Sequence, residues 1–351
     1  MIVFIAPFPA LSDEKDGMIQ RVASIDLLVT DLPRLYLHIS FRRYWLKQTH
    51  HFGLATVFQL NAFFHFFFIV SCLKKASVVY IHSVYNSLPA LLAYWISKPI
   101  TDLHGVVPEE ELYRGNLARA RVYGWVEHIA LHRSKSVVFV TSAMKRHYQQ
   151  KHGRQSSLDR KIPILPKLSD TRGDRENVLS VIRDVKAVIY AGGLQAWQNI
   201  PMMIDAAVNA SQFRFVFLSV EAQTLQLLAK SSNIVHFTCA SVEPHQVPDH
   251  YLKCTYGFIL RDPVLVNQVA CPTKLVEYLY WGVIPIVLTQ DIGDFNELGF
   301  AYVVLKDFRS GKIPNEGETD RMRRLNRKVA EKLIQSCEGE LSTLREVFNY
   351  E

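Results

Sequence analysis

The chain has 351 residues, 49% hydrophobic and 21% charged, a globular composition long enough for two hydrophobic cores. The formal net charge of +7 permits anionic partners such as nucleotide sugars, lipid phosphates or an anionic bilayer surface. No nucleic-acid partner is expected, since no basic block interleaves with aromatic residues. The five cysteines lie far apart without metal-ligand spacing, which favours a reducing compartment without a disulfide framework.

The first half of the chain alternates short apolar runs with helical patterns. Residues 1–7 lack a basic region and stop being apolar too early for a signal peptide, so they predict a first buried strand. Met18, Val22, Ile25 and Val29 then recur at helical spacing. The alternation predicts a parallel sheet with helices on both faces. The expected strands are residues 2–5, 35–39, 78–81, 100–103, 137–140 and 162–165.

The loop at residues 12–17 precedes the helix that carries Arg21. Gly17, at the start of this helix, leaves room for a ligand. We therefore predict acceptor-side or phosphate contacts at Asp16, Gly17 and Arg21, with an ordinary capped helix as the alternative.

A phenylalanine-rich segment at residues 53–73 has about the length of a membrane-spanning helix. Gln59, Asn61 and His65 interrupt it, which favours a buried or amphipathic helix before the strand at 78–81. The alternatives are an aromatic face that docks onto a bilayer and a true span.

His104 follows the predicted strand at 100–103 and precedes a glycine. From this position its ring can donate a hydrogen bond to a sugar or an oxyanion, and a satisfied loop histidine is the alternative. His82 ends the strand before it and is a similar case. Glu109, Glu110 and Glu111 are interpreted as an acidic helix start, with Glu109 or Glu110 as a conceivable base.

A polar stretch at 169–177 separates the two halves, and the second half repeats the same alternation. Residues 200–208 form an amphipathic helix, and a charged helix runs from about 319 to 347. The sequence thus predicts an α/β protein of two Rossmann-like domains facing a cleft, one of residues 1–172 and one of residues 173–351, with the last helix able to pack back on the first domain. The expected strands are 187–190, 213–218, 234–237, 256–260, 284–288 and 302–305.

Gly192 and Gly193 follow the first strand of the second half and precede a helix. Glycines at this point let the backbone approach a phosphate closely, although a tight turn is the alternative. The spacing G-x-G-x-x-G of dinucleotide-binding proteins is absent, and so is the acidic residue that follows the next strand in them.

The segment at 260–287 carries the strongest signal for a ligand. Pro272 predicts the first turn of a helix, and its N-terminus, including Thr273, is a natural anion site after a strand. Lys274 and Glu277 share one face of this helix, which suits phosphate and sugar hydroxyls respectively. Arg261 ends the preceding strand, where its guanidinium can fork onto a diphosphate or pair with the adjacent Asp262.

The sequence contains no Walker motif, no G-x-S-x-G, no H-E-x-x-H and no D-x-D after a strand. Metal chelation of a diphosphate is therefore not expected. We infer that Arg261, Lys274 and helix amides neutralise it, without metal or cofactor.

These motifs resemble glycosyltransferase family 4, the retaining transferases of the GT-B fold, and within it the bacterial enzymes of polysaccharide, lipopolysaccharide and capsule assembly. The resemblance rests on residues 190–199, 260–278 and 102–105, with a weaker similarity at residues 140–145. It implies that Glu277 is the second glutamate of the E-x7-E motif, which holds the donor ribose. It also implies that Pro272 and Thr273 face the diphosphate and the sugar, and that His104 lies close to the transferred sugar.

The sequence departs from this family at two places. The first glutamate of E-x7-E falls at Val269, so its contact is missing or comes from elsewhere, with Asn267 as a candidate. The family's arginine and lysine after the first strand of the second domain fall at Gly193 and Gln198. We infer that Arg261 and Lys274 take over phosphate neutralisation.

The resemblance implies a retaining glycosyltransferase that moves a sugar from a nucleoside diphosphate to a hydroxyl of a glycan or lipid-linked glycan. It also implies that domain 1–172 lies on the acceptor side and that domain 173–351 binds the nucleotide sugar. The alternatives are a GT-B sugar-nucleotide epimerase and a catalytically inactive GT-B scaffold module. The expected location is cytoplasmic, with peripheral contact to the inner face of the membrane as an option.

Overall fold

The computed structural model describes residues 1–9, 17–166, 168, 178, 181 and 183–350. The predicted linker at 169–177, most of the loop at 12–17 and Asp16 lie outside the described residues. The chain divides into two compact units, one of Met1–Ile164 with Ser336–Glu351 and one of Leu165–Gln335. The division after Ile164 is earlier in the chain than the expected one at 172/173, and the last turns of the C-terminal helix belong to the first unit.

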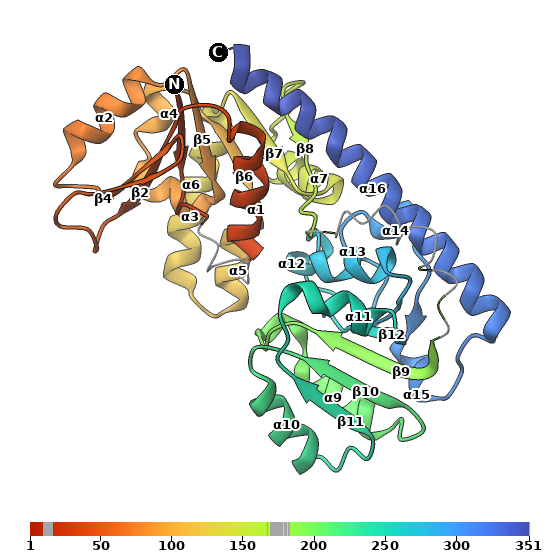
Figure 1. Cartoon of the computed structure of the whole chain (residues 1–351). Coiled ribbons are helices and arrows are strands. Elements are labelled where there is room, and N and C mark those ends of the chain that lie inside the picture. The colour runs from red at the N-terminus through yellow and green to blue at the C-terminus, as the bar shows by residue number, and fades with distance from the viewer. Residues whose placement is uncertain (10–16, 167, 169–177, 179–180, 182, 351) are drawn as a thin grey trace. The chain divides into compact units, whose positions relative to one another are not determined.

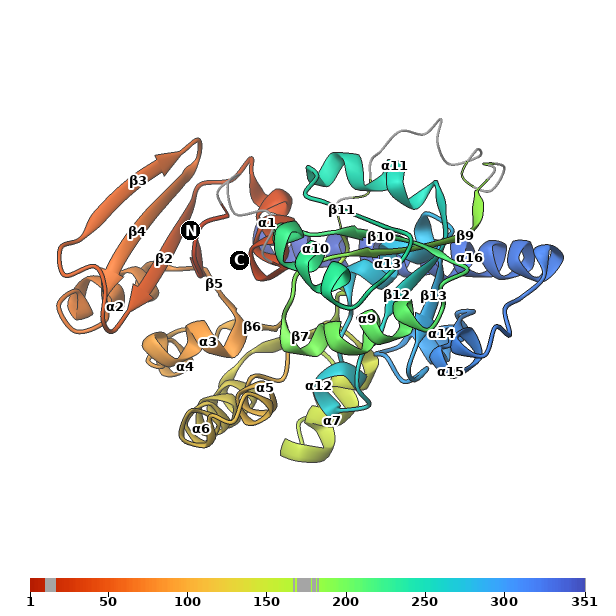
Figure 2. The ribbon, with the colours of Figure 1, turned by 90° about the horizontal axis from the view of Figure 1, so that it is seen from below.

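The first unit is built on a mainly parallel sheet in the order β3-β4-β2-β1-β5-β6-β7-β8 (Figures 1 and 2). Only β3, at the edge, runs antiparallel to its neighbour. The strands are β1 (Ile2–Ile5), β2 (Arg34–Ser40), β3 (Gln48–Phe52), β4 (Ala55–Asn61), β5 (Val78–His82), β6 (Ile100–Leu103), β7 (Ser136–Phe139) and β8 (Arg160–Lys161). The helices are α1 (Gly17–Asp26), α2 (Phe66–Lys75), α3 (Ser83–Ser87), α4 (Ala93–Ile96), α5 (Val107–Tyr113), α6 (Leu117–Arg133) and α7 (Ser142–His152).

The two faces of this sheet bury different side chains because successive residues of a strand point to opposite sides. Val3 and Ile5 of β1 pack in a cluster with apolar residues of α2, α4 and α6. Phe4 points the other way and contacts the rings of Tyr36, Tyr80 and, on the C-terminal helix, Phe348.

The second unit has a parallel sheet in the order β11-β10-β9-β12-β13-β14. The strands are β9 (Asp184–Ala191), β10 (Arg214–Leu218), β11 (Phe237–Ala240), β12 (Cys254–Ile259), β13 (Ile284–Val287) and β14 (Val303–Val304). The helices are α9 (Ile200–Val208), α10 (Ala222–Ser231), α11 (Val247–Tyr251), α12 (Leu265–Gln268), α13 (Thr273–Tyr280), α14 (Phe295–Leu298), α15 (Leu305–Arg309) and α16 (Glu316–Tyr350). Apolar residues of α9, α10 and α15 cover one face of this sheet.

The other face of the second sheet receives α13 through a close approach at Gly257. A Cβ atom at this position would lie 2.4 Å from the ring of Tyr278, so only glycine lets the helix pack this close to β12. The Tyr278 hydroxyl donates to the Ile189 carbonyl of β9 at 3.2 Å. These contacts fix α13 beside the carboxyl ends of β9 and β12.

The two parallel-rich sheets confirm the predicted α/β class, and several sequence predictions need correction. Residues 55–61 form strand β4, and the helix starts only at Phe66, so the single helix expected over 53–73 is wrong. The strand expected at 162–165 lies instead at Arg160–Lys161. The strand expected at 234–237 begins at Phe237, and Leu305, expected at the end of the last strand, begins α15.

None of the helices in the described part of the chain combines the length and the apolar character that a membrane span requires.

Candidate functional site

In the second unit, Gly192 and Lys274 meet at the carboxyl end of β9. A Cβ atom on Gly192 would lie 2.4 Å from Nζ and 2.8 Å from Cε of Lys274. The position therefore has to be glycine for the lysine to reach this place. Gly193 differs, because the three atoms nearest to a Cβ atom there all belong to the side chain of Gln195.

The Lys274 ammonium is held by neutral partners. Nζ lies 3.8 Å from the centre of the Tyr190 ring and donates to Oε1 of Gln198 at 3.2 Å. The lysine is only 8% exposed. Burial, followed by the charge of Arg261, places the pKa of Lys274 well below its usual value. Gln198, which stands at the position of the family's lysine and is one of the expected donor-binding residues, thus contacts Lys274.

Arg261 follows β12 and is the second cation of the site. Its Nη1 donates to Oδ1 of Asn267 at 3.4 Å, and burial lowers the pKa of Arg261 to about 10. Asp262, the alternative partner expected from the sequence, accepts a hydrogen bond from Asn199 instead. Among the described residues no carboxylate forms an ion pair with Arg261 or Lys274. The site thus brings together a buried cation, Lys274, and a partly buried one, Arg261, with Glu277 as the acidic group whose charge acts on Lys274.

Glu277 lies one helical turn after Lys274. Its Oε2 accepts a hydrogen bond of 2.8 Å from the hydroxyl of Tyr251, and burial raises the pKa of Glu277. The carboxylate thus has a fixed orientation and retains acceptor capacity for hydroxyl groups.

The start of α13 differs slightly from the prediction. Pro272 is the residue before the helix, with extended backbone, and Thr273 is the first helical residue. Val269, which stands where the family resemblance implies a glutamate, is 3% exposed. Asn267, the candidate substitute, is buried and uses its amide to bind the Asp262 carbonyl and Arg261. These contacts link Asn267 to Arg261 and to the end of β12.

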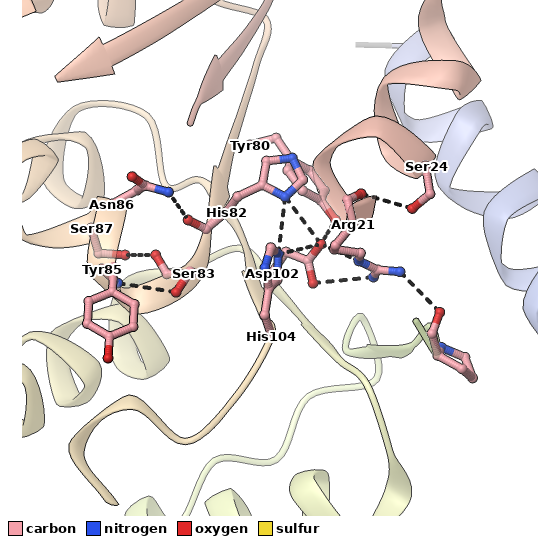
Figure 3. Close-up of polar contacts among 11 residues, drawn as sticks. Arg21, Ser24, Tyr80, His82, Ser83, Tyr85, Asn86, Ser87, Asp102 and His104 are labelled. Atoms are coloured by element: carbon pink, nitrogen blue, oxygen red, sulfur yellow. Dashed lines mark hydrogen bonds and ion pairs between the residues drawn. The ribbon is translucent and has the colours of Figure 1, made fainter. Parts of the chain in front are cut away.

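In the first unit, four side chains converge on the carboxylate of Asp102 (Figure 3). Oδ2 accepts from Nε of Arg21 at 2.8 Å and from the Tyr80 hydroxyl at 2.9 Å. His82 and His104 place a ring nitrogen 3.6 Å and 3.5 Å from the same oxygen. Parallel pairing of β5 with β6 sets His82 beside Asp102.

The buried charges of this network compensate one another. Burial by itself would raise the pKa of Asp102, but the positive charge of Arg21 and the interactions with His104 and His82 together outweigh burial and hold this pKa well below its usual range. Burial lowers the pKa of His82 far enough for a neutral ring. Nδ1 of His82 lies 3.2 Å from Nε2 of His104, so one ring donates to the other. Within the described part of the chain, Nδ1 of His104 is buried and has no hydrogen-bond partner.

His82, Asp102 and His104 also satisfy the spacing of a metal-ligand set, since their ligand atoms all lie within 4.8 Å of one another. Their chemistry fits a cation poorly. Oδ2 of Asp102 already accepts two hydrogen bonds, and the fixed charge of Arg21 lies 2.8 Å away. The set is therefore a hydrogen-bonded network that orients His104.

Ser83, directly after His82, has a φ of 67°, which is unfavourable for a residue with a side chain. Ser83 is held by neighbours, since its Oγ accepts from the Tyr85 amide and its carbonyl from the Ser87 hydroxyl (Figure 3). The His82 carbonyl accepts from Asn86 Nδ2 at 2.6 Å. The end of β5 thus has a defined, strained geometry beside the candidate site.

The structure gives Arg21, which was predicted to contact the acceptor or a phosphate, other partners. Arg21 is 1% exposed and is committed to Asp102 and to the Pro163 carbonyl, so it positions other groups rather than facing an acceptor. Gly17 is the first residue of α1. Glu109 and Glu110 lie in the first turn of α5 as expected, and Glu109 pairs with Lys151 at 2.6 Å.

Sequence reasoning missed Tyr190, Tyr251, Tyr80 and Asp102. Each is a neutral or buried partner of a predicted residue and carries no local motif of its own. Asp102 was visible as an acidic residue inside an apolar strand, a pattern that calls for a buried cation.

No protein-family model matches this sequence, and no curated protein sequence matches it either. Solved structures do match. Sucrose-phosphate synthase from Thermosynechococcus elongatus has a TM-score of 0.68 at 12% identity, covering 100% of this chain and 99% of that one. HepE from Anabaena, in complex with UDP and glucose, has a TM-score of 0.63 at 13% identity, covering 98% of each chain.

WaaG, a glycosyltransferase involved in lipopolysaccharide biosynthesis, has a TM-score of 0.59 at 11% identity, with 100% of both chains covered. The three likenesses extend over the whole chain and confirm the predicted GT-B fold. At this identity they show the fold and leave the activity to be argued from the residues.

Proposed function

We propose that this chain is a glycosyltransferase that moves a sugar from a nucleoside diphosphate to a hydroxyl of a glycan or lipid-linked glycan. The observation that carries the proposal is the pair Lys274 and Arg261. Both cations lack a carboxylate partner among the described residues, and they gather where the parallel strands β9 and β12 end, the usual ligand edge of such sheets. A diphosphate supplies the missing negative charge.

The remaining donor-site residues have complementary roles in this proposal. Glu277 accepts hydrogen bonds from the ribose hydroxyls, and Tyr251 holds its carboxylate in place. Gly192 leaves room for the diphosphate and the lysine together. Pro272 and Thr273 present the start of α13 to phosphate oxygens. The fold shared with UDP-binding HepE supports a nucleotide-sugar donor.

The proposed reaction is a front-side displacement. The bond between the anomeric carbon and the diphosphate oxygen breaks, and the departing oxygen takes the proton of the acceptor hydroxyl as the new glycosidic bond forms on the same face. Retention of the anomeric configuration of the sugar is inferred from the family resemblance. His104, oriented by His82 and Asp102, is proposed to donate a hydrogen bond from Nδ1 to the transferred sugar. Arg261 and Lys274 neutralise the leaving group, so no metal is required.

The resemblance further suggests a role in bacterial surface polysaccharide assembly, including lipopolysaccharide or capsule. The test is product analysis with the purified chain, a panel of nucleotide sugars and lipid-linked glycan acceptors, with and without a chelator. We expect a glycosylated acceptor, free nucleoside diphosphate and no effect of the chelator. Conversion of the donor without any acceptor would identify an epimerase. Donor binding without hydrolysis or transfer would identify an inactive scaffold.

A further inference from the structure

The positive charge of the chain is concentrated in one segment. Residues 32–101 contain seven lysines and arginines and no aspartate or glutamate. The rest of the chain carries 33 basic and 33 acidic residues, so this segment accounts for the whole formal net charge of +7. Arg34 is buried and paired with Asp26, but the other six cations give the segment an excess of positive charge that attracts anions.

Large apolar side chains are exposed on the same segment. We define the aromatic patch as Phe41, Trp45, Leu46, Phe63, Phe64 and Phe67. Trp45 and Phe64 are each 64% exposed, Phe63 is 70% exposed, and Leu46 and Phe67 are more than four-fifths exposed. Exposure of one such residue is ordinary, whereas a contiguous group marks an interaction surface.

The patch comes from two loops that leave neighbouring strand ends. Ser40 at the end of β2 pairs with Asn61 at the end of β4, so the loop after β2 and the turn before α2 start side by side. Ring contacts join them, with centroids 5.0 Å apart for Trp45 and Phe64 and 5.4 Å for Phe41 and Phe63. Figures 1 and 2 show α2 beside this edge of the sheet.

Asn61 fixes the two loops to each other. Its buried amide donates to the carbonyls of Phe41 at 3.2 Å and Arg43 at 3.1 Å, and its Oδ1 accepts from the amides of Phe63 and Phe64. The exposed rings are therefore presented by a rigid frame, which lowers the entropic cost of binding.

Three exposed cations lie within the same loop as Trp45 and Leu46. Arg42 and Arg43 precede them, and Lys47 follows. The Lys47 ammonium lies 4.6 Å from the centre of the Phe68 ring, next to the patch. Aromatic rings between lysines and arginines are the composition that binds the headgroup region of an anionic membrane.

We propose that the aromatic patch and Arg42, Arg43 and Lys47 dock the chain onto an anionic lipid bilayer. The rings enter the boundary between headgroups and acyl chains, while the three cations bind lipid phosphates. Charge complementarity selects a bilayer over a second copy of this chain, because two copies would bring the acid-free segments together. This inference does not depend on the proposed transfer reaction, since docking needs no catalytic residue.

The test is co-sedimentation of the purified chain with phosphatidylglycerol vesicles and with phosphatidylcholine vesicles. We expect binding to phosphatidylglycerol that weakens as salt rises. The triple variant Arg42→Gln/Arg43→Gln/Lys47→Gln should bind on the order of 100-fold more weakly. The triple variant Trp45→Ala/Phe64→Ala/Phe67→Ala should lose at least about tenfold. Brominated acyl chains should quench fluorescence of the wild type more than that of Trp45→Phe.

Matched controls come from the second unit. Leu227→Ser/Val235→Ser removes two apolar side chains with similar exposure, and Arg321→Gln/Arg324→Gln/Lys328→Gln removes three cations from α16. Both should bind vesicles like the wild type. Equal binding by the patch variants, or equal binding to both lipids, would overturn the proposal. It would also be overturned if the patch variants convert a dimer to a monomer in analytical ultracentrifugation, which would assign the patch to a second copy.

Discussion

The ammonium nitrogen of Lys274 lies 3.8 Å from the centre of the Tyr190 ring, in the space that any side chain on Gly192 would fill. The ring face is a weak substitute for an anion, so the ammonium group lies in an unfavourable, desolvated environment. A diphosphate would relieve this cost directly. The contact between Lys274 and Tyr190 therefore links the geometry of the candidate site to its proposed ligand.

The first prediction concerns how the affinity for the donor changes at alkaline pH. Burial and the charge of Arg261 lower the pKa of Lys274 in the free protein, and a bound diphosphate raises this pKa. Affinity for the donor should be constant below the lowered pKa and fall as pH rises above it, by up to about tenfold per pH unit. Titration calorimetry in buffers of different ionisation enthalpy should detect proton uptake. Lys274→Arg should remove the uptake, and an equal uptake in that variant would refute the assignment.

The second prediction concerns how the affinity for the donor changes at acid pH. Burial raises the pKa of Glu277, and ribose hydroxyls need its ionised form as acceptor. Donor affinity should therefore fall as pH drops through this raised pKa. Glu277→Gln should bind more weakly at neutral pH and lose the acid dependence. A wild-type affinity that is flat toward acid pH would contradict the role of Glu277.

The third prediction compares two adjacent glycines. Gly192→Ala should push the Lys274 ammonium off the Tyr190 ring, because the new Cβ would lie 2.4 Å from Nζ. Donor affinity should fall by about tenfold or more with little loss of stability, since a flexible side-chain end can move. Gly193→Ala, which meets only Gln195, is the matched control and should bind nearly as the wild type does. A larger effect from Gly193→Ala would mean that phosphate contacts the second glycine instead.

The fourth prediction concerns the buried pair of Arg21 and Asp102. Arg21→Met leaves a buried carboxylate without its cation and should lower the free energy of unfolding by about 3–5 kcal/mol. Adding Asp102→Asn should recover part of this loss. Because the pKa of Asp102 is lowered in the fold, its contribution is present above the unfolded pKa near 3.9 and disappears as pH falls below it. Urea unfolding at neutral and acid pH measures both effects. Full stability of Arg21→Met would show that the pair is solvated.

Much of the fold could be predicted where the spacing of apolar residues and the length of the segment indicate the same type of element. The helix expected at 200–208 has the bounds of α9, and most strand centres are correct. The errors fall where the pattern is ambiguous. In residues 53–73 the apolar run is nearly continuous, which does not distinguish a strand from a buried helix, and pairing with β2 made residues 55–61 a strand.

The candidate site was predictable in part for a related reason. Lys274, Arg261 and Glu277 carry charge close to strand or helix ends, so local rules find them. Tyr190 and Tyr251 could not be found, because their roles depend on a ring face and a hydroxyl reached only through the tertiary fold. Likewise, the contact of His82 with Asp102 requires the order of β5 and β6 in the sheet.

The most direct measurement is the dissociation constant of nucleotide sugars for the wild type, Lys274→Ala and Glu277→Ala, together with turnover of the donor that binds best. Lys253→Ala, an exposed lysine in the same unit, is the control. The account predicts that Lys274→Ala lowers turnover by about 10²–10³-fold and that Glu277→Ala weakens donor binding, while Lys253→Ala changes neither. Unchanged binding and turnover in both site variants would contradict it.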